Sequence, residues 1–304
     1  MIMKIQNEKL ITVLKALASK LGNTPVVDLG DGIFGKVEGA NPAGSVKDRA
    51  AFYIIKSAVE DGKLSAGGTV VEGTSGNTGI GLASVAREVG LHAVICMPES
   101  MTEERRKMIL SYGAELQLTP ASEGMAGAVA AAKRIERERG AFIANQFANP
   151  ASIEAHFKTT APELFGQLKD VKAVVCGVGS GGTAMGFAKY IAQNGLNCKI
   201  IAVEPSSSPL MSEGRAGAHK IQGIGANFIP DLVDVSQFDE IMTIGDDEAI
   251  SAVRRIYKLT GVKCGISSGA AYAAAKRKRS EIDGNIAVIL PDNGERYDSS
   301  LYTE

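Results

Sequence analysis

The stretch TVVEGTSGNTGIGLASVAREVGLHAVICM, residues 69–97, contains the pattern that decides the fold. A short β-branched run at Thr69–Glu72 leads through a turn rich in Gly, Ser and Thr into a helix-length amphipathic segment at Asn77–Val89. A second apolar run follows at Ala93–Met97. A strand, a helix and another strand in this order predict parallel strands joined by a helical crossover.

The same alternation recurs along the chain, which predicts an α/β fold. The further segments expected are helices at Thr102–Tyr112, Glu123–Arg139 and Gly182–Ala192, and strands at Leu116–Thr119, Ile143–Gln146, Ala173–Cys176, Ile200–Val203 and Ala287–Leu290. One set of units ends before Asn149–Pro150 and another begins after Asp170, which predicts two domains, residues 1–150 and 151–304. Each is expected to be a mostly parallel sheet flanked by helices, although the first residues can pack on the second domain. A ligand is expected at the carboxyl ends of the strands.

Composition favours small molecules as partners. The chain has 304 residues, with 33 Lys and Arg against 34 Asp and Glu and a formal net charge of -1, so no broad field attracts nucleic acid or anionic lipid. Residues 1–22 mix charges into a helical period, which predicts a folded helix and not a secretion signal, and no membrane span is expected. The 4 cysteines form no C-x-x-C pair, which favours a reduced cytoplasmic protein and predicts no metal site.

The segment NPAGSVKDR, residues 41–49, places Lys47 just before the predicted helix Ala50–Glu60. The amino-terminal end of a helix disfavours positive charge, so a lysine there is helped to act as a neutral amine. Imine formation and proton abstraction both need such an amine. Taken alone, the segment is better explained by a surface lysine paired with Asp48.

The segment TSGNTG, residues 74–79, separates a predicted strand from a predicted helix. Hydroxyls, an amide and backbone N–H groups at a helix start form a receptor for a carboxylate. A capped turn would explain one polar residue here, but not four in succession.

The segment GVGSGGT, residues 177–183, follows another predicted strand and leaves room for a phosphate against the backbone. It also matches G-x-G-x-x-G, and Glu204 ends the next strand where a ribose-binding acid belongs, so a dinucleotide is an open alternative. The segment GISSG, residues 265–269, opens a further helix, where a serine is also a common cap.

Together these four segments resemble the cysteine synthase and cystathionine β-synthase family, fold-type-II pyridoxal-phosphate enzymes with a tryptophan-synthase-β-like fold. NPAGSVKDR, TSGNTG, GSGGT and GISSGA occur in the family's order and approximate spacing. LGNTP at 21–25, NQFANP at 145–150 and GERY at 294–297 also fit, so the resemblance spans residues 21–297.

The resemblance implies a role for each matched residue. Lys47 would attach the cofactor and transfer the α-proton, Asn77 would bind the cofactor's phenolic oxygen, and Ser267 would meet the pyridine nitrogen. The substrate carboxylate would be held by Thr74, Ser75, Thr78 and Gln146. The cofactor phosphate would be held by Gly179, Ser180, Gly181, Gly182 and Thr183.

The implied reaction is a pyridoxal-phosphate-dependent β-replacement, in which O-acetylserine and sulfide give L-cysteine through an aminoacrylate intermediate. A neutral hydroxyl at the pyridine nitrogen would favour loss of a β-substituent over transamination. A homodimer is implied as well. Cystathionine formation and sulfide release from cysteine remain alternatives on the same intermediate, and a nicotinamide-dependent enzyme is a third.

The stretch GIGANFIP, residues 223–230, departs from the family pattern GIGAGFIP. A polar residue at position 227, here Asn227, resembles the pattern of the cystathionine β-synthase branch of the family. Asp231 follows the stretch directly. A carboxylate near the intermediate would activate water or bind a larger amino-acid nucleophile, which makes both residues candidates for specificity. Alternatively, Asp231 belongs to a solvated surface turn.

Overall fold

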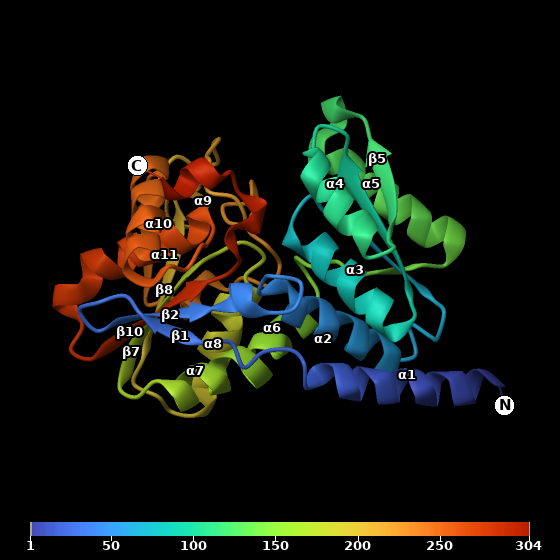
Figure 1. Cartoon of the computed structure of the whole chain (residues 1–304), viewed down its shortest axis with the longest axis horizontal. Coiled ribbons are helices and arrows are strands. Elements are labelled where there is room, and N and C mark those ends of the chain that lie inside the picture. Colours follow the sequence, from blue (N-terminus) through green and yellow to red (C-terminus); the bar gives the residue numbers. More distant parts are fainter. Residues whose placement is uncertain (1, 304) are drawn as a thin grey trace. The chain divides into compact units, whose positions relative to one another are not determined.

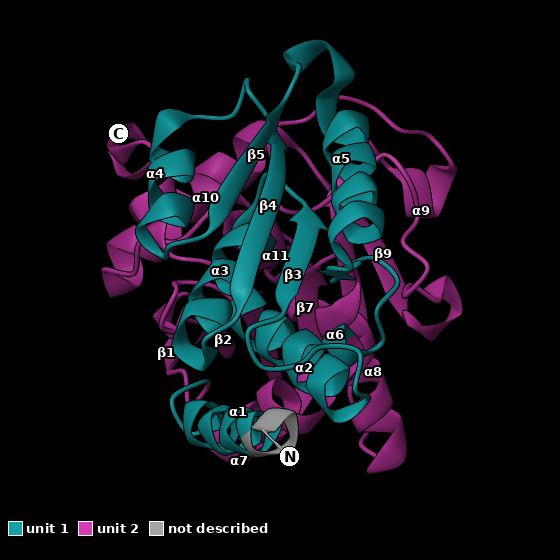
Figure 2. Ribbon diagram, turned by 90° about the vertical axis from the view of Figure 1, so that its right-hand side faces the viewer, with its two compact units in different colours: residues 1–21, 47–152 teal, residues 22–46, 153–304 magenta. Residues whose placement is uncertain are grey.

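A computed structural model describes residues 2–303. The chain forms two compact units, the first from residues 1–21 and 47–152 and the second from residues 22–46 and 153–304 (Figure 2). The predicted division at residue 150 lies close to the later crossing between units. The sequence also allowed the first residues to pack on the second domain, whereas in the structure residues 22–46 are the early segment that joins the second unit.

The first unit contains a parallel sheet in the order β5-β4-β3-β6. Its strands are β3 (Thr69–Gly73), β4 (His92–Pro98), β5 (Glu115–Thr119) and β6 (Phe142–Ile143). Its helices are α1 (Ile2–Ala18), α2 (Lys47–Glu60), α3 (Asn77–Val89), α4 (Glu103–Ser111) and α5 (Gly124–Arg139), and α6 (Ala151–Ala155) crosses into the second unit.

The order of the strands determines which face each helix of the first unit covers. The chain moves outward from β3 to β5 through α3 and α4, and α5 then returns it to β6 on the other side of β3. Because such crossovers are right-handed, the outward helices and the returning helix lie on opposite faces, as Figure 2 shows. Small residues of α5 such as Ala128 and Ala132 pack on Val71 and Val94 of the sheet.

The second unit contains a six-stranded sheet in the order β1-β2-β10-β7-β8-β9. β1 and β2 are antiparallel and the other pairs are parallel. The strands are β1 (Val26–Asp28), β2 (Ile33–Val37), β7 (Val171–Gly177), β8 (Lys199–Pro205), β9 (Glu240–Ile244) and β10 (Asn285–Leu290). The helices are α7 (Ala161–Gln167), α8 (Gly182–Gln193), α9 (Leu210–Glu213), α10 (Asp246–Thr260) and α11 (Ile266–Lys278), with a π-helical turn at His156–Thr160 (Figure 1).

The core of the second unit has two layers because successive strand residues face opposite sides of the sheet. Ala173 and Val175 of β7 pack in the layer that contains α10 and α11. Val174 and Cys176 pack in the layer that contains Phe187 of α8. The near-continuous apolar run of β7 therefore reflects burial on both faces.

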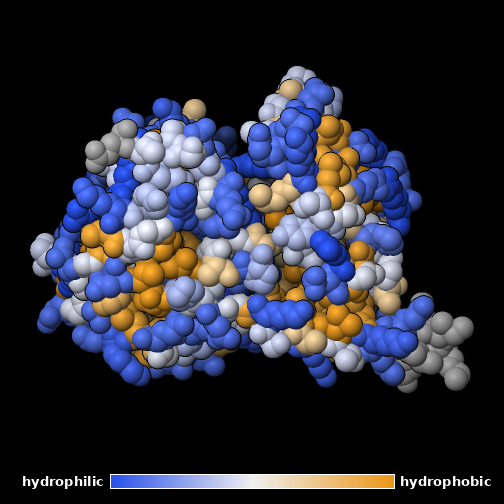
Figure 3. All heavy atoms as spheres, in the orientation of Figure 1, coloured by the Kyte–Doolittle hydropathy of each residue, from blue (hydrophilic) through white to orange (hydrophobic). Residues whose placement is uncertain are grey.

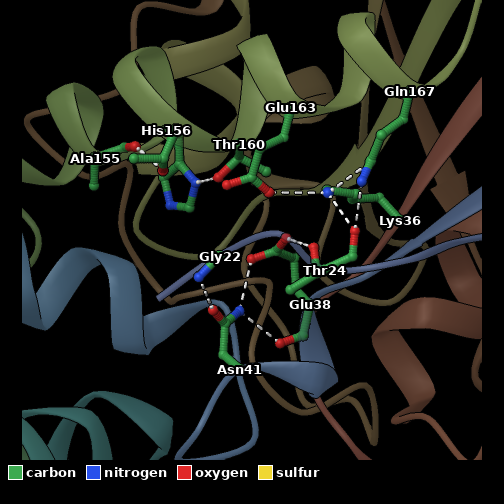
Figure 4. Close-up of polar contacts among 11 residues, drawn as sticks. Gly22, Thr24, Lys36, Glu38, Asn41, Ala155, His156, Thr160, Glu163 and Gln167 are labelled. Atoms are coloured by element: carbon green, nitrogen blue, oxygen red, sulfur yellow. Dashed lines mark hydrogen bonds and ion pairs between the residues drawn. The ribbon is translucent and has the colours of Figure 1, made fainter. Parts of the chain in front are cut away.

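A buried lysine helps explain why residues 22–46 join the second unit. Lys36 of β2 has no exposed surface, and its Nζ donates hydrogen bonds to Thr24 O at 2.7 Å, Glu163 Oε2 at 3.0 Å and Gln167 Oε1 at 2.9 Å (Figure 4). A buried ammonium group is tolerated only with such partners. Together with the β2–β10 pairing, these contacts tie the segment to α7.

The predicted α/β class with two mostly parallel, helix-flanked sheets is confirmed. The helix expected at Asn77–Val89 has the same bounds as α3. The strand expected at Ala173–Cys176 corresponds to β7, which begins two residues earlier and ends one residue later. The strands β1, β2 and β9 and the helix α10 were not predicted from the sequence.

On the face drawn in Figure 3, hydrophobic residues gather in patches among hydrophilic ones. Within residues 2–303, no helix has the length and apolar character needed to cross a membrane.

Candidate active site

In the first unit, the turn between β3 and α3 carries the predicted carboxylate receptor. Gly76 precedes the helix, and Thr74 Oγ1 accepts a hydrogen bond from Gly76 N at 3.3 Å. Thr74 N donates to Cys96 O at the end of β4, at 2.9 Å, which ties the turn to the sheet. The first N–H groups of a helix have no partner within it, so this helix start suits an anion.

Gln146 lies far from this turn in sequence but contacts it in the structure. Thr78 Oγ1 donates a hydrogen bond to Gln146 Oε1 at 2.5 Å, and both residues are buried. The structure therefore brings together two of the residues predicted to hold the substrate carboxylate.

Glu72 at the end of β3 holds the backbone that carries Gln146. Its carboxylate accepts hydrogen bonds from Asn145 N at 2.7 Å and from Gln146 N at 3.4 Å. Burial raises the pKa of Glu72 to about 7, although these hydrogen bonds lower it. Asn145 has a positive φ of 49°, so the turn that Glu72 holds is tight. Glu72 was not predicted as a functional residue, since an acid at the end of a strand is a weak signal in a sequence.

Lys47 is the first residue of α2 and is half-buried. A Cβ added to Gly81 of α3 would lie 3.0 Å from the carbonyl oxygen of Lys47, so the absence of a side chain at residue 81 favours this close packing. The first turn of α2 thus lies against α3, one helical turn after Asn77. Arg105 of α4 adds a positive group, because its Nη1 donates to Ser75 O at 2.9 Å.

In the second unit, the loop Gly179–Thr183 leads directly into α8. Its glycines allow a close approach of backbone, since a Cβ on Gly179 would collide with the carbonyl oxygen of Gly223. Gly181, with a φ of 86°, precedes the helix. Ser180 is buried in this loop and Thr183 lies in the first turn of α8. A loop of this geometry at a helix start suits an anion such as a phosphate group, as the sequence predicts.

The segment that contains Asn227 and Asp231 runs beside this loop. Gly225 N donates to Val178 O at 3.1 Å, and a Cβ on Gly181 would collide with the side chain of Val233. Asn227 and Asp231 are both exposed. Gly225 and Val233, on either side of the two candidate residues, therefore lie against the backbone at Val178 and Gly181, while the side chains of Asn227 and Asp231 face solvent.

Ser267 occupies the second position of α11 and is buried. Gly265 precedes the helix in an extended conformation. Ser267 thus belongs to the same unit as the glycine loop, whereas Lys47 and the carboxylate receptor belong to the other unit.

Glu204 stabilises the start of α9. Its carboxylate accepts hydrogen bonds from Met211 N at 2.8 Å and from Ser212 N at 3.0 Å, in the first turn of α9. Glu204 is also almost fully buried. A ribose would have to compete with these bonds.

Comparison with known proteins decides between the two cofactors. The sequence model of the family described as pyridoxal-phosphate dependent enzymes matches residues 17–292. The chain belongs to this family. The nicotinamide alternative is therefore wrong, and the cofactor is pyridoxal phosphate.

Several relatives are similar over almost their whole length. A cysteine synthase of Staphylococcus aureus is 46% identical, over 93% of this chain and 95% of that protein. The crystal structure of O-acetylserine sulfhydrylase isoform 3 from Entamoeba histolytica has a TM-score of 0.89 and 36% identity, covering 96% of this chain and 91% of that one. A hydrogen sulfide-producing enzyme from Fusobacterium nucleatum has a TM-score of 0.86 and 37% identity, covering 94% of this chain and 99% of that one. The resemblance to fold-type-II enzymes of the cysteine synthase family is thus confirmed.

Proposed function

We propose that this protein transfers sulfide to the β-carbon of O-acetylserine, releasing acetate and forming L-cysteine. The observation that carries the proposal is the hydrogen bond between Thr78 and Gln146, which supports a carboxylate receptor in the unit that contains Lys47. The likeness to the Staphylococcus aureus cysteine synthase supports this choice of substrates.

The residues present fit the cofactor. Bound pyridoxal phosphate supplies a carbonyl for amino groups and a ring that stabilises negative charge at the α-carbon. The loop Gly179–Thr183 holds the phosphate at the start of α8, and Asn77 holds the phenolic oxygen. Ser267 offers a neutral hydroxyl to the ring nitrogen.

Lys47 carries the proton chemistry in this proposal. Its Nζ attaches the cofactor at rest, accepts the α-proton of the substrate and returns it to the product. Thr74, Ser75, Thr78 and Gln146 bind the α-carboxylate and so orient the α-proton toward Lys47.

A product assay tests the function. The purified protein with pyridoxal phosphate, O-acetylserine and sulfide is expected to form cysteine and acetate in equal amounts. Acetate release without cysteine would contradict the choice of nucleophile, and loss of neither substrate would contradict the reaction class.

The surroundings of Asp231 favour a second candidate, release of sulfide from cysteine. The Asp231 segment lies against the proposed phosphate loop, and the Fusobacterium nucleatum neighbour is described as hydrogen sulfide-producing. Incubation with cysteine alone distinguishes the two, because only the second activity yields sulfide, together with pyruvate and ammonia, without another substrate.

We further propose that the protein is a cytoplasmic homodimer. All four cysteines are buried and form no disulfide bonds, which is consistent with a reducing compartment. Sedimentation equilibrium at micromolar concentration is expected to give twice the mass of 31.8 kDa. A single-chain mass would contradict the dimer.

A further inference from the structure

A buried histidine connects the π-helical turn to the glycine loop. His156 is 1% exposed, and its Nδ1 lies 2.8 Å from Thr160 Oγ1. Its Nε2 lies 3.3 Å from Thr183 Oγ1, in the first turn of α8. Figure 4 shows His156 and Thr160 pointing toward each other from the same helical stretch.

The π-helical geometry and a glycine bring His156 to this position. Extra residues in a helical turn shift side chains out of the regular helical register, and such turns are frequent at functional sites. A Cβ on Gly186 of α8 would collide with the Cβ of His156, so α8 approaches the turn closely only because residue 186 is glycine. His156 was not predicted as a functional residue, because a lone histidine in a helix is a weak signal in a sequence.

Thr160, His156 and Thr183 form a hydrogen-bonded series. While the imidazole is neutral, the protons in this series can be arranged in only two ways. A neutral imidazole has one N–H donor and one nitrogen acceptor, and each threonine hydroxyl has one hydrogen. If Nδ1 carries the proton, Thr183 must give its hydrogen to Nε2 and has none for a ligand. If Nε2 carries the proton, it donates to Thr183 Oγ1, which leaves the Thr183 hydrogen for an acceptor in the loop.

We propose that His156 is a positioning residue that directs the Thr183 hydroxyl toward the cofactor phosphate. Thr160 donates to Nδ1, Nε2–H donates to Thr183, and Thr183 donates to a phosphate oxygen. The proposal rests on the proposed assignment of Gly179–Thr183 as the phosphate site. Burial keeps His156 in one orientation, so the hydroxyl is oriented before the phosphate arrives.

Nitrogen NMR of the cofactor-loaded protein tests the proton order without a mutation. The chain contains only 3 histidines, so side-chain signals can be assigned by substituting His92 and His219 in turn. The expected result is the neutral Nε2–H form of His156. A neutral Nδ1–H form, or a doubly protonated ring, would overturn the proposal.

Affinity measurements test the consequence. His156→Asn retains a group near Nδ1 and lacks the donor near Nε2, whereas His156→Gln places an amide N–H near Nε2. We expect His156→Asn to weaken binding of pyridoxal phosphate to the apoprotein on the order of tenfold and to shift the phosphorus NMR signal of the bound cofactor, with His156→Gln restoring both. The matched control is His92→Asn at an exposed position of β4, which should change neither.

The Thr183→Val background separates this proposal from the assignment of the phosphate site. Thr183→Val alone should weaken cofactor binding, and adding His156→Asn should then have no further effect. If Thr183→Val alone leaves the affinity unchanged, the assignment of the phosphate site fails. If Thr183→Val weakens binding but His156→Asn weakens it equally in both backgrounds, only the role of His156 fails. Should His156→Asn not fold, Thr160→Val, which removes the outer hydrogen bond, takes its place in the same cycle.

Discussion

The carboxylate of Glu72 accepts a hydrogen bond from the backbone N–H of Asn145 at 2.7 Å, across 73 positions of sequence. The next residue, Gln146, contacts Thr78 at the start of α3. One buried acid thus connects the end of β3 to the segment whose side chain, Gln146, belongs to the proposed carboxylate receptor.

We expect the stabilising contribution of Glu72 to fall as the pH rises. Its pKa rises from an ordinary value of 4.5 to about 7 in the folded protein because of burial. Between these two values the unfolded chain releases the proton while the folded protein keeps it, so the free energy of unfolding decreases with pH in this window. The difference in free energy of unfolding between the wild-type protein and the Glu72→Gln variant should therefore decrease by about 3 kcal/mol as the pH rises from 4.5 to 7. Urea unfolding at several pH values measures it, and a constant difference would contradict the titration of Glu72.

Lys47→Ala should abolish turnover, by about a thousandfold or more, because it removes both the covalent attachment and the proton carrier. The helix content and melting temperature should change little, since Lys47 is half-buried at a helix start. Lys56→Ala on the same helix is the control, because Lys56 forms an exposed pair with Glu60. Near-normal activity of Lys47→Ala would disprove its role.

Thr78→Val should raise the KM for O-acetylserine about tenfold, because it removes the hydroxyl that donates to Gln146 Oε1 and so leaves Gln146, a proposed carboxylate ligand, without its buried partner. The affinity for pyridoxal phosphate should be unchanged. Steady-state kinetics and a cofactor titration measure the two effects. Thr12→Val on α1, at an exposed site, is the matched control. A loss of cofactor affinity in place of the KM effect would reassign Thr78.

Ser267→Asp should slow acetate release from O-acetylserine by at least about tenfold, or about 1.4 kcal/mol in the barrier. A carboxylate would hold the ring nitrogen protonated, whereas the native hydroxyl does not. Ser267→Ala keeps the site neutral and serves as the control. Rapid-quench measurement of acetate without sulfide isolates this half of the reaction, and equal rates in both variants would rule out the proposed contact.

Asp231→Asn should lower reaction with water or with homocysteine about tenfold more than reaction with sulfide, because sulfide ionises unaided near neutral pH and needs no base. Competition assays with the three acceptors give the ratio directly. Asp283→Asn, at another exposed aspartate of the second unit, is the control. An equal effect on all acceptors, or none, would leave Asp231 as a surface residue.

Local pattern was sufficient for the elements with strong periodicity and for the polar and glycine-rich turns at strand–helix junctions. The bounds of α3 and the position of the glycine loop depend on turn chemistry and on burial within a few residues, so the sequence predicts them. The motif set also led to the family and its cofactor, because ordered motifs over residues 21–297 are specific.

Contacts between distant segments required the folded chain. Residues 22–46 join the second unit through the β2–β10 pairing and the burial of Lys36. The sequence around Lys36 does not indicate that Glu163 is its partner. The same holds for Glu72 with Asn145 and for His156 with Thr183. In each case a buried polar group is tolerated only because a partner from another part of the chain satisfies it, and the choice of that partner depends on how the strands and helices pack.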